Sequence, residues 1–67
     1  MKTDVLLQCM EQEGISQMIL AGALGLTQAA LRKKLSGDVP FEPDEEAVAT
    51  RLLGMTEQEA QYVFHAE

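Results

Sequence analysis

With 67 residues, of which 46% are hydrophobic, the chain is long enough for one small domain and too apolar for a disordered one. One cysteine and one histidine exclude an internal disulfide and a structural zinc site. The net charge of -6 argues at first sight against a nucleic-acid-binding protein, because phosphate binding draws on lysine and arginine. Few aromatic residues and only two prolines favour a packed helical domain over residues 1–67.

The expected location and chemistry follow from what the sequence lacks. No apolar run approaches the ~18 residues of a membrane span, and the N-terminus lacks the basic-then-apolar pattern of a signal peptide. The lone Cys9 suits a reducing compartment and a buried structural role. We expect a cytoplasmic protein that contacts no membrane. Without a glycine-rich phosphate loop or a nucleophile beside a base, we expect no enzyme, no cofactor and no metal.

A first helix is predicted over residues 3–13, with Thr3 as its N-cap and Gly14 at its end. Its apolar side chains recur at helical spacing. They are Val5, Leu6, Cys9 and Met10.

Two short helices joined by a tight turn are predicted at about residues 16–36. Ser16 can cap a helix that Gly25 ends, since glycine tolerates the positive φ needed there. Thr27, only two residues later, can cap a second helix over residues 28–35. Helices so close in sequence must cross steeply. This is the geometry of a helix-turn-helix, whose second helix can enter the major groove of DNA.

The first helix of this pair, about residues 17–23, is apolar on nearly every side. Gln17 is its one polar residue, and Gly22 within it either permits close approach of another backbone or reflects relaxed selection. In so small a domain some of this surface must face outward. Met18 and Ile19 are therefore either a slightly apolar surface or a contact for a protein partner.

The second helix of the pair has a buried stripe at Leu31 and Leu35. Three of the five basic residues of the chain are consecutive within it, at 32–34, so we expect a small positive patch on a negative body. At about 100° per residue, the positions facing away from the stripe or to its side are Ala29, Lys33, Ser36, Gln28 and Arg32.

This outward face has the residues that read base edges. Gln28 can pair with adenine, Arg32 or Lys33 can reach guanine, and the alanine methyls can touch those of thymine. The alternative is a solvated basic face that complements the negative C-terminal end of the helix dipole.

The rest of the chain is predicted to form a connector and two helices. Gly37 stops the preceding helix, and Phe41 within residues 36–42 is expected to plug the core. Pro43 suits the first position of a fourth helix, and the acids at 44–46 suit its positive N-terminal end better than a metal site. Inward positions are expected at Val48, Leu52 and Leu53, with Gly54 closing the helix.

The fifth helix is predicted from a capping box. Thr56 and Glu59 have the spacing at which each side chain accepts from the other's backbone amide. Its shared apolar face consists of Ala60, Val63 and Phe64, and His65 is expected to be solvated.

Five short motifs follow one another along the helix pair: Ser16-Gln17, Leu20-Ala21, Leu24-Gly25-Leu26-Thr27, Leu31 and Leu35-Ser36-Gly37. They resemble the sequence pattern of the XRE or Cro/repressor family of phage and bacterial regulators. That pattern runs Ser/Thr-Gln, then Leu-Ala, then Leu-Gly-Ile/Leu-Ser/Thr, then Leu, and finally Leu with Asn/Ser-Gly. The last two helices also look like the family's, through Phe41, Leu52-Leu53-Gly54 and Thr56-Glu57-Gln58-Glu59. The stretch at 32–37 is similar to a small prophage Cro-like branch.

The resemblance implies an all-α, five-helix domain of lambda-repressor-like type that binds double-stranded DNA. Gln17 then falls where the family bonds a backbone phosphate, and Gln28, Ala29 and Lys33 fall where it reads bases. Arg32, Lys34 and Ser36 fall where bases or phosphates are touched; we assign Arg32 to bases and the other two to phosphates.

We therefore expect a transcriptional regulator that binds its operator as a homodimer, because one domain of this size touches only a few base pairs. The other hypothesis keeps the fold but makes it a protein-interaction module, such as an antirepressor or antitoxin-like partner with little DNA binding. The net negative charge and the apolar Met18 and Ile19 motivate it.

Overall fold

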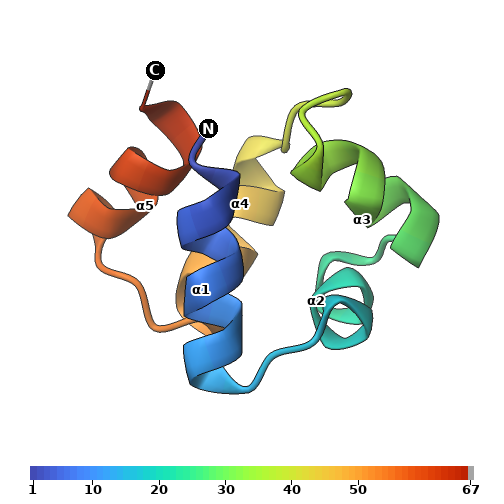
Figure 1. Ribbon diagram of the computed structural model, residues 1–67, viewed down its shortest axis with the longest axis horizontal. Coiled ribbons are helices and arrows are strands. Elements are labelled where there is room, and N and C mark those ends of the chain that lie inside the picture. The colour runs from blue at the N-terminus through green and yellow to red at the C-terminus, as the bar shows by residue number, and fades with distance from the viewer. Residues whose placement is uncertain (67) are drawn as a thin grey trace.

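The computed structural model of the chain describes residues 1–66, and in these residues the only regular elements are helices. They are α1 (Thr3–Glu13), α2 (Gln17–Leu24), α3 (Gln28–Leu35), α4 (Pro43–Leu52) and α5 (Glu57–His65) (Figure 1). The prediction of an all-α chain with five helices is confirmed, and the five helix starts, together with the ends predicted at residues 13, 23 and 35, lie within one residue of the expected positions.

The predicted caps of three helices are present. Ser16 Oγ accepts from the amide of Ile19, and Thr27 Oγ1 accepts from the amide of Ala30, each at 3.1 Å. Thr56 and Glu59 form the reciprocal capping box, with bonds of 3.1 and 2.9 Å. These bonds satisfy amides that a helix start leaves unpaired, so the chain fixes its own helix boundaries locally.

Thr3 does not cap α1, contrary to the prediction. The helix begins at Thr3 itself, after Lys2, which makes no capping bond. The hydroxyl of Thr3 instead donates to the carbonyl oxygen of Leu35 at 3.0 Å. Because that carbonyl lies in the last turn of α3, where no helical amide follows to bond it, Thr3 ties α1 to the end of α3.

The core draws one fully buried side chain from each of four helices: Leu6, Leu20, Leu31 and Val63. Helix α4 adds Ala49, and Leu53 follows at its end. Phe41 plugs the core as predicted, with its ring edge-on to that of Phe64 at 5.5 Å between centroids. Cys9 is partly buried against this cluster.

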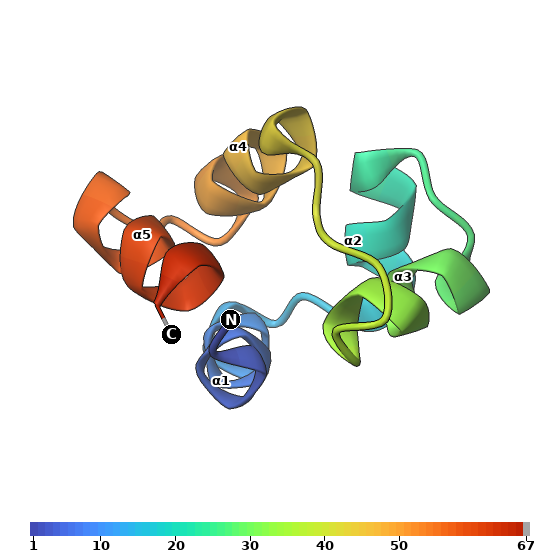
Figure 2. The same ribbon diagram turned by 90° about the horizontal axis from the view of Figure 1, so that it is seen from above.

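Helix α4 lies between α2 and α5 and packs against both of them (Figure 2). Helix α1 packs against α5, and α2 packs against α3. In Figure 1, α2 is seen nearly end-on while α3 runs across the view, so these two helices cross. In both views α3 lies at the edge of the molecule (Figures 1 and 2).

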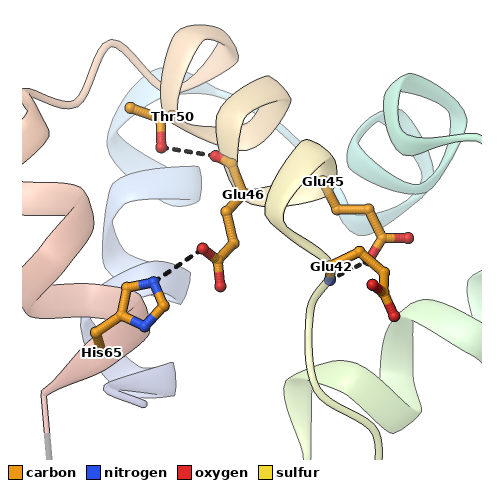
Figure 3. A network of polar contacts seen from close by, with 5 residues as sticks. All are labelled: Glu42, Glu45, Glu46, Thr50 and His65. Carbon is orange, nitrogen blue, oxygen red and sulfur yellow. Dashed lines mark hydrogen bonds and ion pairs between the residues drawn. The ribbon is translucent and has the colours of Figure 1, made fainter.

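A buried ion pair fastens α3 to α4. Lys34 and Glu45 are each 8% exposed, and Nζ of Lys34 donates to Oε1 of Glu45. The same carboxylate oxygen accepts from the amide of Glu42 at 2.9 Å, at the start of α4 (Figure 3). Burial raises the pKa of Glu45, but the bonds from Glu42 and Lys34 outweigh it and hold the pKa below its ordinary value.

Removing one member of this pair should destabilise the fold strongly. Lys34→Met leaves the Glu45 carboxylate buried without its cation, which costs about 3 to 5 kcal/mol in the free energy of unfolding. The double variant Lys34→Met/Glu45→Gln removes both charges and keeps an oxygen for the amide of Glu42, so it should recover most of that loss. Urea unfolding followed by circular dichroism measures the free energy of unfolding of both variants. If the single and the double variant lose the same free energy relative to the natural chain, the pairing is contradicted.

The pair should also make the free energy of unfolding depend on pH. Because the pKa of Glu45 is lowered from 4.5 by folding, its stabilising contribution is present above about pH 4.5 and is lost as pH falls through the lower folded-state pKa. Thermal unfolding from about pH 7 to pH 2 should show the natural chain losing stability relative to Lys34→Met/Glu45→Gln. Glu59, whose pKa the amide of Thr56 also lowers, is common to both chains and cancels. A relative stability independent of pH would refute this.

Candidate nucleic-acid interface

The outward face of α3 is exposed along its length. The exposed side chains on it are Gln28, Ala29, Arg32, Lys33 and Ser36. Helix α3 is held from its other side by Leu31, Lys34 and Leu35, which are all buried. The helix is thus anchored by one face while the opposite face is open to solvent.

The two cations on this face have no acidic partner within the described chain. Among residues 1–66, Lys34 pairs with Glu45 and His65 lies within hydrogen-bonding distance of Glu46, and neither contact includes Arg32 or Lys33. Unpaired, exposed guanidinium and ammonium groups can bind phosphate or guanine without first breaking an internal bond. This part of the surface therefore remains positive although the chain as a whole is negative.

The two glutamines assigned to DNA lie at the first positions of α2 and α3. Gln17 follows the capping hydroxyl of Ser16, and Gln28 follows that of Thr27; both glutamines are exposed. The capping residues fix where each helix begins, and so they fix where each amide side chain leaves the backbone. Each glutamine stands at the positive end of its helix dipole, where an anionic oxygen is favoured.

Lys34 is not on the exposed face. The prediction that Lys34 contacts a phosphate is wrong in this respect, because its ammonium is buried against Glu45. Only two of the three consecutive basic residues therefore present their charge to solvent. The sequence does indicate that Lys34 lies toward the core, because it follows Leu31 by three residues and so lies beside the buried stripe at helical spacing. The sequence did not reveal which acid would pair with it.

Ser36 is exposed at the end of α3, where its hydroxyl donates to the carbonyl oxygen of Lys33 at 2.9 Å. To donate to a phosphate, Ser36 would have to exchange this bond. Of the residues assigned to phosphate, Gln17 is the one whose side chain is both exposed and without a hydrogen bond among residues 1–66.

A second polar cluster lines a groove of about 750 Å³ between α4 and α5. His65, expected to be solvated, is exposed, but its Nε2 lies 2.9 Å from Oε1 of Glu46 (Figure 3). Thr50 donates to the backbone oxygen of Glu46 at 2.7 Å. An exposed pair of this kind contributes little to stability and provides no nucleophile, so we assign the groove no chemistry.

Among residues 1–66, no three acidic, histidine or cysteine side chains are grouped so that they could hold a metal ion. None of the helices described here combines the length and the apolar character that crossing a membrane requires.

Comparison of the chain with protein-family models, with curated proteins and with solved structures finds no match.

Proposed function

We propose that the chain is a sequence-specific DNA-binding regulator of the phage Cro or repressor type. In this proposal α2 and α3 form a helix-turn-helix of the lambda-repressor-like kind, and α3 lies in the major groove. The observation that supports it most is the open face of α3, on which Arg32 and Lys33 are exposed and unpaired among residues 1–66.

The dimensions of α3 suit this role. An α-helix with its side chains is about 10 to 12 Å across, and the major groove is about 12 Å wide. Ala29 is small, so the start of the helix can approach the base edges closely while Gln28 bonds adenine. Arg32 and Lys33, one turn further, reach guanine or the flanking phosphates.

Two cations per chain give modest affinity, so the proposal requires two copies on a two-fold symmetric operator, with half-sites about 34 Å apart. Affinity should fall with rising salt, with a log-log slope of roughly 0.9 for each phosphate neutralised.

Removal of either cation should weaken DNA binding selectively. Arg32→Ala and Lys33→Ala should each raise the dissociation constant by roughly ten-fold to a hundred-fold, since a good base or charged contact contributes about 1 to 3 kcal/mol. Fluorescence anisotropy with duplexes from the DNA flanking the gene, at roughly 50 mM salt, measures this.

Arg51→Ala is the matched control, because Arg51 is an exposed arginine on α4 and its loss changes the net charge equally. The proposal fails if no duplex binds at micromolar protein, or if Arg51→Ala weakens binding as much as Arg32→Ala.

The second candidate, a protein-interaction module on the same fold, is favoured by one observation. Met18 is 64% exposed and Ile19 is 48% exposed, so α2 presents apolar surface to solvent. The same titration separates the candidates, because such a module forms no complex with any duplex at low salt.

A further inference from the structure

The face of α2 that points away from the core is apolar and carries no charge. It consists of Met18, Ile19, Gly22 and Ala23, all exposed. At about 100° per residue these four positions span roughly 140°, opposite the buried Leu20 and Ala21. The face lies within eighteen consecutive residues, Gly14 to Leu31, that include no Asp, Glu, Lys, Arg or His, although 24% of the chain is charged.

Gly22 is not required by the packing within the chain. A Cβ atom placed on it meets no atom within 4 Å, and its backbone is helical. Glycine there costs about 1 kcal/mol relative to alanine and gains nothing inside the molecule. What it does provide is a place at which another backbone can come close to α2.

We propose that this face of α2 pairs with the same face of a second copy of the chain. A two-fold symmetric interface places a patch of one copy against the same patch of the other copy. A patch whose charges are all of one sign is therefore repelled. In a chain with a net charge of -6, an uncharged apolar face is the surface that escapes this repulsion. A basic partner would find no acid on it, and an acidic partner no base.

The pairing should be weak and should strengthen with salt. The face has four exposed residues, whereas a standard interface has roughly 20 to 30 residues on each side. Salt screens the repulsion between two negative chains, so it should favour the dimer, whereas it weakens DNA binding. The proposal concerns the chain alone, and the opposite salt responses distinguish its failure from that of the proposed function.

The test is sedimentation equilibrium of the full chain without DNA, at roughly 10 to 500 μM protein and in both low and high salt. The average mass should rise from monomer toward twice that value with concentration, and should rise further at high salt. Met18→Lys/Ile19→Lys should weaken the dimer by roughly ten-fold or more, because like charges then face each other across the two-fold axis.

Leu7→Lys/Tyr62→Lys is the matched control, because Leu7 and Tyr62 are 41% and 54% exposed on α1 and α5. Both double variants make the chain less negative by two charges, so a loss confined to the α2 variant cannot reflect net charge. Circular dichroism verifies that each variant is folded. A natural chain that stays monomeric, or a dimer that survives Met18→Lys/Ile19→Lys, would overturn the proposal.

Discussion

The position of α3 depends on the ion pair between Lys34 and Glu45. Both charges are withdrawn from water, a cost that their mutual attraction and the bond from the amide of Glu42 must offset. Such a pair adds little net stability over an apolar pair, but its two charges are satisfied only when Lys34 reaches Glu45, and this contact ties α3 to the start of α4. Thr3 adds a second polar tie, through the carbonyl oxygen of Leu35.

Anchoring α3 by one side determines what its other side presents. With Lys34 neutralised inside the molecule, the surface of α3 carries the two charges of Arg32 and Lys33 and a short, uncharged start at Gln28 and Ala29. The charge that the proposed DNA contact depends on is therefore local, and it has the opposite sign to the net charge of -6 of the whole chain.

The two surfaces proposed to bind partners are different in kind. The cationic face of α3 suits a polyanion, and its attraction is screened by salt. The uncharged face of α2 suits the same face of a second copy. The attraction between two such faces is hydrophobic, so salt does not weaken it by screening charge. Because α2 and α3 pack against one another, a chain with both properties would present DNA contacts and a dimer contact on neighbouring helices.

Sequence alone determined the local structure of this protein. Helix starts at Ser16, Thr27 and Thr56 are set by hydroxyls that bond amides three residues away, and apolar stripes follow from the helical period, so both can be predicted without knowing the fold. The exposed outward face of α3 was predictable for the same reason.

Only the tertiary structure decided the contacts between residues distant in sequence. Thr3 bonds Leu35, Lys34 pairs with Glu45 and His65 meets Glu46, and none of these was predicted. Each depends on how helices are placed in space, which periodicity and capping do not encode. That placement buried one of three adjacent basic residues and left Arg32 and Lys33 exposed to solvent.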